Sequence, residues 1–184
     1  MNYRWWIFVA VLLFGIGIVF GLAAPAGIAG LISEDLAALE ELSDILAPFK
    51  VSTVIFIFLK NALALLLSFA LSPIFCLVPI LTLSVNGWLL AFVSSIAIQE
   101  KSLGFVLVAL LPHGIIELPA LFIGEAAALS FGAMAIIALF KKEGRNLLFP
   151  SLRQNLKYLS IALALLLPAA IIETYITPLL INLI

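Results

Sequence analysis

The chain has 184 residues, of which 65% are hydrophobic and only 10% are charged, and its mean hydropathy is +1.32. A soluble domain is about 45–50% apolar and about 25% charged, so this composition predicts an integral membrane protein and excludes a disordered chain or a coiled coil. A net charge of −1 argues against nucleic acid as a partner, and the single cysteine, Cys76, excludes an internal disulfide.

The first predicted span covers residues 5–23. It follows Arg4, and it opens on Trp5 and Trp6, a pair typical of a membrane interface. The segment from Gly17 to Gly21 has the GxxxG spacing that lets two helices approach closely. This stretch also resembles a signal peptide, but its apolar run is long for one and further spans follow, which favours a retained anchor.

Residues 33–49 break the apolar pattern. Apolar residues recur there at helical spacing with acidic residues between them, Ser33 is a suitable N-cap, and Pro48 ends or kinks the segment. The pattern predicts an external amphipathic helix that either lies on the protein's own spans or docks to another protein. Its acidic polar face argues against binding to anionic lipid.

The second and third predicted spans, residues 51–71 and 74–98, both carry polar residues. A charge near the middle of a span costs roughly 3 kcal/mol or more on insertion scales, so Lys60 should face protein or water rather than lipid. Asn61 follows it directly. In the third span the dipeptide Asn86-Gly87 predicts either a broken helix or a close approach of two backbones.

The segment 103–140 is too long for one ordinary crossing. As a single helix it would measure about 57 Å, whereas the hydrocarbon core is about 30 Å thick. Its only charged residues are Glu117 and Glu125. Irregular backbone inside a membrane must be buried in protein or line a cavity. The predicted break is marked by Pro112, Gly114 and Pro119.

Charge decides how often this segment crosses. Basic residues follow it and predict a cytoplasmic loop: Lys141, Lys142, Arg145, Arg153 and Lys157. Arg4 places the N-terminus in the cytoplasm as well, so the chain must cross an even number of times between Arg4 and these basic residues. Residues 103–140 should therefore form one crossing plus a re-entrant or tilted half-segment, broken near the two prolines. The last predicted span, residues 156–172, is the fifth and leaves the C-terminus outside.

These elements predict one all-α integral membrane domain in the cell membrane, with about five transmembrane helices. Several polar residues then fall inside it and form the candidate functional cluster: Lys60, Asn61, Asn86, His113, Glu117, Glu125 and Glu173. Buried ionisable groups in a membrane are functional candidates because burying them is expensive. His113 and Glu117, four residues apart, share one helical face, whereas Glu125 is rotated away from it.

Three interpretations of this cluster compete. It can be a satisfied structural cluster in which Lys60 pairs with Glu117 or Glu173 and His113 bonds a backbone carbonyl. It can be a transport or proton pathway, since histidine beside carboxylates suits proton handling. It can also be a divalent metal site, with zinc as the candidate ion and His113, Glu117 and Glu173 as ligands, which would permit metal-assisted hydrolysis.

Small residues also recur at Gly124, Ala128 and Gly132. Such stripes are helix-packing surfaces, either inside the chain or between two copies in a homodimer.

The stretch from Pro112 to Pro119, with the sequence PHGIIELP and a small-residue helix after it, resembles the stage II sporulation protein M family of membrane proteins. Asn61, the dipeptide Asn86-Gly87 and the segment from Glu173 to Pro178 also look like that family's pattern. The resemblance covers about residues 51–178. It implies a multi-span membrane protein and importance for these positions, including Gly87. The family's namesake works with membrane and wall-degrading partners during engulfment.

The sequence therefore favours a non-catalytic membrane component that scaffolds or assists partners in envelope remodelling. Its expected partners are the lipid bilayer and other membrane or envelope proteins. The alternative is a transporter or a metal-dependent intramembrane hydrolase built around His113, Glu117 and Glu173.

Overall fold

Five helices of the computed structural model are long and apolar enough to cross a membrane. The structure describes residues 2–24 and 48–183, and these are helical with short turns between the helices. The elements are α1 (Tyr3–Leu22), α4 (Val51–Leu71), α5 (Leu77–Glu100), α6 (Leu103–Phe140) and α7 (Lys142–Ile171), followed by the π-helical turn η1 (Ile172–Ile176) and the short helix α8 (Thr177–Ile181). The predicted all-α membrane class is confirmed. The predicted amphipathic helix over residues 33–49 lies outside the described residues, except for a turn at Pro48 and Phe49.

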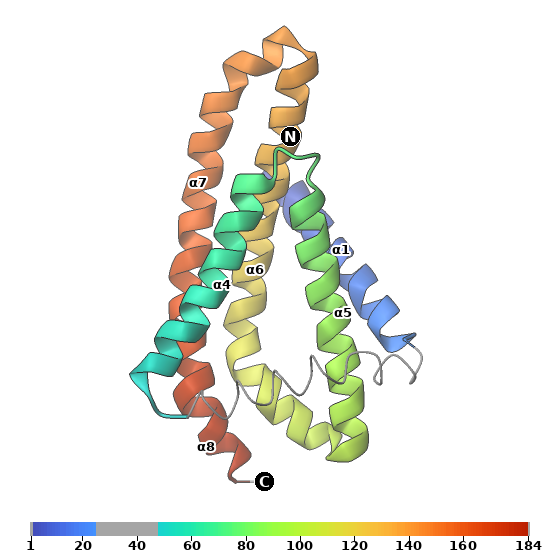
Figure 1. Cartoon of the computed structure of the whole chain (residues 1–184), viewed down its shortest axis with the longest axis vertical. Coiled ribbons are helices and arrows are strands. Elements are labelled where there is room, and N and C mark those ends of the chain that lie inside the picture. Colours follow the sequence, from blue (N-terminus) through green and yellow to red (C-terminus); the bar gives the residue numbers. More distant parts are fainter. Residues whose placement is uncertain (1, 25–47, 184) are drawn as a thin grey trace.

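The helices alternate in direction along the chain, so the two termini lie at opposite ends of the bundle (Figure 1). The N-terminus lies at the same end as the junction between α6 and α7, and the turn between α5 and α6 lies at the other end. This arrangement agrees with five crossings. Which end faces the cytoplasm stays a prediction from the basic residues.

The predicted break and the re-entrant alternative for residues 103–140 are wrong, because α6 is one continuous helix of 38 residues with Pro112 and Pro119 inside it, whereas the tilted alternative agrees with the structure. Figure 1 shows a bend instead, with the first part of α6 inclined toward the end of α5. Proline lacks a backbone N–H and its ring crowds the preceding turn, so it kinks a helix without necessarily ending it. The excess length is accommodated by this inclination and by extension at the far end, with no re-entrant turn.

The predicted basic loop is also wrong, because α7 begins at Lys142 and only Lys141 separates it from α6. The fifth helix is therefore longer than the predicted span of residues 156–172. Its basic first part lies at the end of the bundle, beyond α4 and α5 (Figure 1). A basic segment can stay helical there because its side chains need not enter the hydrocarbon layer, so the cluster of basic residues did not indicate a loop.

α1 packs against α5 through three glycines. A β-carbon on Gly17 would collide with the backbone carbonyl of Ser84, and one on Gly21 with the carbonyl of Trp88. From the other side, a β-carbon on Gly87 would collide with the carbonyl of Phe14. The GxxxG spacing is thus a real packing seam, and Asn86-Gly87 marks a close approach of two backbones inside an unbroken helix.

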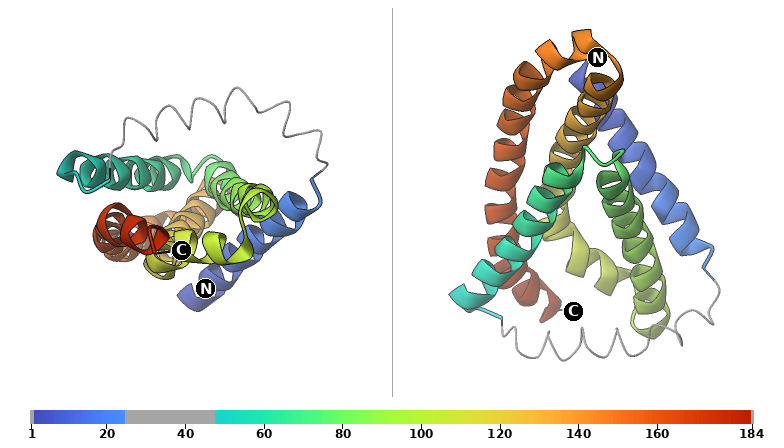
Figure 2. Two further views of the ribbon diagram at one scale, coloured as in Figure 1. Left: turned by 90° about the horizontal axis from the view of Figure 1, so that it is seen from below. Right: turned by 45° about the horizontal axis from the view of Figure 1, so that its top comes forward.

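α6 is the central helix, with α1 and α7 on opposite sides of the bundle (Figure 2). Its small-residue stripe packs inside the chain: Gly124 faces the side chain of Leu65, and Gly132 faces the backbone of Ser72. Ala128 between them is fully buried. This matches the intrachain alternative. Cys76 is a free, buried thiol, as expected of a small apolar residue.

Candidate functional site

One end of the bundle contains an open cavity of about 710 Å³, which we call the polar cavity. Its wall comes from the turn before α4, from α4 and α6, and from η1 and α8. Five of the predicted cluster residues meet there: Lys60, Asn61, His113, Glu117 and Glu173. Lys60 and Glu173 are far apart in the sequence. They are brought together only by the packing of α4 and α6 against the end of α7.

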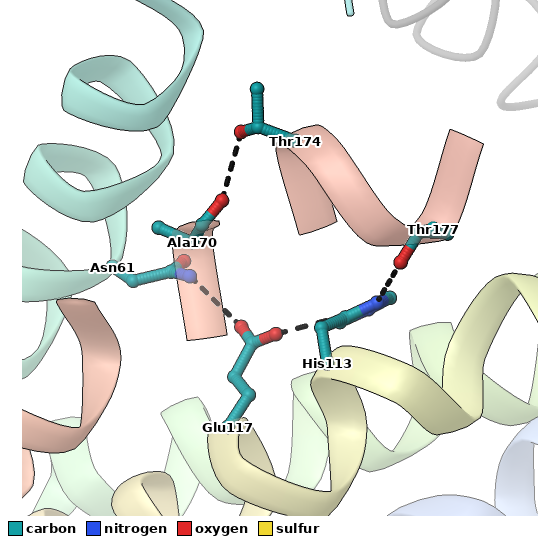
Figure 3. Close-up of polar contacts among 6 residues, drawn as sticks. All are labelled: Asn61, His113, Glu117, Ala170, Thr174 and Thr177. Carbon is teal, nitrogen blue, oxygen red and sulfur yellow. Dashed lines mark hydrogen bonds and ion pairs between the residues drawn. The ribbon is translucent and has the colours of Figure 1, made fainter. Parts of the chain in front are cut away.

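Hydrogen bonds fix the two α6 residues of this cavity (Figure 3). Asn61 Nδ2 donates to Glu117 Oε1 at 2.9 Å, and the hydroxyl of Thr177 lies 3.5 Å from His113 Nδ1. The atoms left facing each other, His113 Nε2 and Glu117 Oε2, are 4.0 Å apart. That distance is too long for a hydrogen bond, so within the described part of the chain both atoms are free to contact a third group between them.

The π-helical turn η1 carries the third ionisable residue, Glu173, to the cavity. Such turns insert one extra residue into a helix, which rotates everything after it, and they occur often at functional sites. Pro178 lacks the N–H that would normally bond the carbonyl of Thr174 four residues earlier. The N–H of Phe49 donates to that carbonyl instead, at 3.3 Å. This bond ties the turn before α4 to the wall formed by η1.

Lys60 does not form the predicted ion pair. Among the described residues its ammonium group lies more than 4.0 Å from any carboxylate oxygen, although it lines the same cavity as Glu117 and Glu173. The expected bond from His113 to a backbone carbonyl is also absent from the described hydrogen bonds, and Thr177 takes that place. The structural interpretation is thus only partly met: the cluster is charged and open rather than fully paired.

The polar cavity groups three side chains of types that bind metal ions. One ligand atom each from His113, Glu117 and Glu173 lies within 4.8 Å of the others. Asn61 and Thr177 hold the remaining carboxylate oxygen and ring nitrogen, and such outer contacts orient ligands in real metal sites. A nearby cationic lysine opposes a second positive charge. Catalytic zinc sites combine three protein ligands with an open position, usually with more than one nitrogen or sulfur ligand, so one histidine and two carboxylates form a lean set for zinc.

Two predicted members of the cluster lie elsewhere. Asn86 donates to the carbonyl of Thr82 on its own helix at 2.7 Å. Glu125 is completely buried between α4 and α6, where Ser68 Oγ donates to its Oε2 at 2.6 Å. Both residues line a second cavity, described below, and neither lines the polar cavity.

Sequence reasoning missed Thr177 and the turn at Phe49. Thr177 lies beside Pro178 within the tail segment that carries Glu173, but its direction depends on the π-helical turn. Because a π turn has no composition signature of its own, the residues that face the cavity after it could not be assigned from helical periodicity.

A bundle of five membrane-length helices around buried polar groups defines an integral membrane protein. The model of the family described as stage II sporulation protein M matches residues 10–178, and the chain belongs to this family. The chain is also 27% identical over 173 residues to an uncharacterized protein of Methanocaldococcus jannaschii, and the match covers 94% of this chain and 93% of that protein. No solved structure matches it.

Proposed function

We propose that the protein is a non-catalytic membrane component that assists partner proteins in envelope remodelling, and that partners bind at the polar cavity. The observation that carries this proposal is the open, charged recess inside the membrane-spanning bundle. Lys60 and Glu173 face that recess without an ion pair between them within 4.0 Å. An intramembrane charge that lacks a close partner among the described residues is well suited to a polar group on another transmembrane segment.

Site-specific photo-crosslinking in intact cells tests this proposal. A photoreactive residue replaces Ile57, which lines the polar cavity, and the control replaces Leu63, an exposed residue on the same helix outside both cavities. We expect a discrete protein adduct from position 57 and none from position 63. The adduct should disappear in the variant Glu173→Gln. Equal adducts from both positions, or lipid adducts alone at position 57, would contradict a partner at this cavity.

A second candidate function is metal-dependent hydrolysis, and the convergence of His113, Glu117 and Glu173 within 4.8 Å favours it. A divalent ion held there would supply an activated water. In that case Asn61 would hold Glu117 in its ligating orientation and Thr177 would do the same for His113.

The variant His113→Asn separates the two candidates. An amide keeps hydrogen-bonding ability but is a poor zinc ligand. If the protein assists partners without a metal, the Asn variant keeps its stability and the crosslink at position 57. If it is a metalloenzyme, the variant folds but loses both bound metal and activity, measured by elemental analysis of purified protein beside the wild type. A folded variant that sheds a stoichiometric metal would favour the enzyme.

A further inference from the structure

A second cavity of about 570 Å³ lies between α4, α5 and α6, and we call it the apolar cavity. Leucine and isoleucine contribute half of the residues in its wall. Asn61, His113 and Glu117 line both this cavity and the polar cavity, so these three side chains form a partition between the two. Figure 1 shows α4 and α5 diverging from the turn that joins them, with α6 behind.

Glu125 gives this cavity an unusual feature. The residue has no exposed surface, and it lines the apolar cavity. Its Oε2 accepts the hydrogen bond from Ser68, but its Oε1 has no hydrogen-bond partner in the described part of the chain. A buried polar atom without a partner costs about 1–3 kcal/mol, and buried polar groups are otherwise nearly always bonded. Because Glu125 belongs to the cavity wall, a rotation of its side chain would bring this unsatisfied atom to a polar group that enters the cavity.

The wall of the apolar cavity also reaches the lipid-facing surface. Leu107, Leu111 and Ile115 line the cavity and are also 45%, 52% and 68% exposed. In a membrane such exposed apolar side chains face lipid tails. An alkyl chain can thus pass from the bilayer into the cavity without crossing a polar barrier.

We propose that the apolar cavity binds a single-chain amphiphile with a hydroxyl head group, whose chain lies along the leucine-rich wall and whose hydroxyl bonds Glu125 Oε1. A hydroxyl group both donates and accepts, so it satisfies this oxygen whether or not the carboxyl group carries a proton. The volume falls within the range of about 300–1,000 Å³ typical of small-molecule sites. This site is separate from the partner-binding proposal, which rests on the other cavity.

The test uses 1-dodecanol and, as its matched probe, 1-chlorododecane, which has the same chain but no hydrogen-bond donor. Binding to the purified full chain is counted by native mass spectrometry and followed by thermal unfolding. We expect one dodecanol per chain and, near 100-fold saturation, a rise in Tm of about 5 °C. The chloride should bind at least about 10-fold more weakly, since it leaves the Glu125 oxygen unpaired.

Two variants locate the binding. Glu125→Met keeps the side-chain length but removes the acceptor, so it should bind both probes equally. Gly114→Leu should block both probes, because Gly114 lines the apolar cavity and a β-carbon there meets nothing within 4 Å. Gly15→Leu is its control, since Gly15 also faces open space but lies on α1 outside this cavity. Ser94→Leu, on the α5 wall, replaces Gly114→Leu if the latter does not fold.

Equal binding of dodecanol and chlorododecane to the wild type would overturn the role of Glu125. Unchanged dodecanol binding in a folded Gly114→Leu or Ser94→Leu protein would overturn the site itself. Neither result would bear on the crosslink at position 57, so failure of this inference is distinguishable from failure of the proposed function.

Discussion

Glycine has opposite roles in two regions: the packing seam between α1 and α5, and the wall of the apolar cavity between α4, α5 and α6. At Gly17 the missing side chain lets two backbones touch, and a β-carbon would collide with the Ser84 carbonyl. At Gly114 the missing side chain leaves open space beside a cavity. The glycines of the seam therefore stabilise the fold, whereas Gly114 leaves the apolar cavity open for a ligand. Substitutions in the two regions should separate stability from function.

The largest effect is expected from Gly17→Leu. The side chain would force α1 away from α5, and overpacking against a backbone that cannot move aside should destabilise the fold by about 3 kcal/mol or more. Thermal unfolding in detergent measures this as a lowered Tm. Gly15→Leu, two residues away and facing open space, serves as the control and should unfold near the wild-type temperature. Similar Tm values for both variants would contradict the conclusion that close packing at Gly17 stabilises the fold.

A smaller effect is expected in the partition between the cavities. Asn61→Leu removes the 2.9 Å hydrogen bond to Glu117 and should cost about 1–2 kcal/mol, because a partly buried carboxyl oxygen loses its donor. Asn86→Leu is the matched control, since that side chain is exposed and, among the described residues, bonds a carbonyl of its own helix. It should change stability by less than about 0.5 kcal/mol. A larger loss of stability in Asn86→Leu than in Asn61→Leu would mean that the hydrogen bond from Asn61 to Glu117 does not stabilise the fold.

Lys60→Met should change stability by less than about 1 kcal/mol, because the lysine is exposed and forms no ion pair within 4.0 Å among the described residues. A buried pair would instead cost about 3–5 kcal/mol on losing one partner. A double-mutant cycle with Glu173→Gln measures their coupling. A coupling energy above about 2 kcal/mol would show that the two charges do meet in the membrane.

Cysteine labelling should leave stability unchanged and decide which side the polar cavity faces. In a Cys76→Ser background, a reagent added outside the cell should label Glu100→Cys but not Lys142→Cys. Both positions are exposed and lie at opposite ends of the bundle. That result would place the polar cavity, which is lined by C-terminal residues such as Asn182, toward the outside. Labelling of position 142 instead would invert the topology.

The candidate site was predictable only in part. His113 and Glu117 could be paired from their spacing of four, and Glu173 was identifiable as an intramembrane charge. Asn86 and Glu125 were grouped with them because polar residues are rare in this chain, but rarity carries no information on direction. The contact of Asn61 with Glu117 spans 56 residues, and no local pattern encodes such a separation.

By itself, the sequence determined the membrane class, the number of membrane-length helices and the positions of the costly polar groups, since these follow from hydropathy summed along a segment. The tertiary structure alone decided that the long segment 103–140 stays one helix, and that Glu117 faces an open polar cavity while Glu125 is buried in the wall of an apolar one. Both outcomes depend on which neighbours the helices meet. Burial and hydrogen bonding are set by those neighbours, whereas helical periodicity reports only the face on which a residue lies.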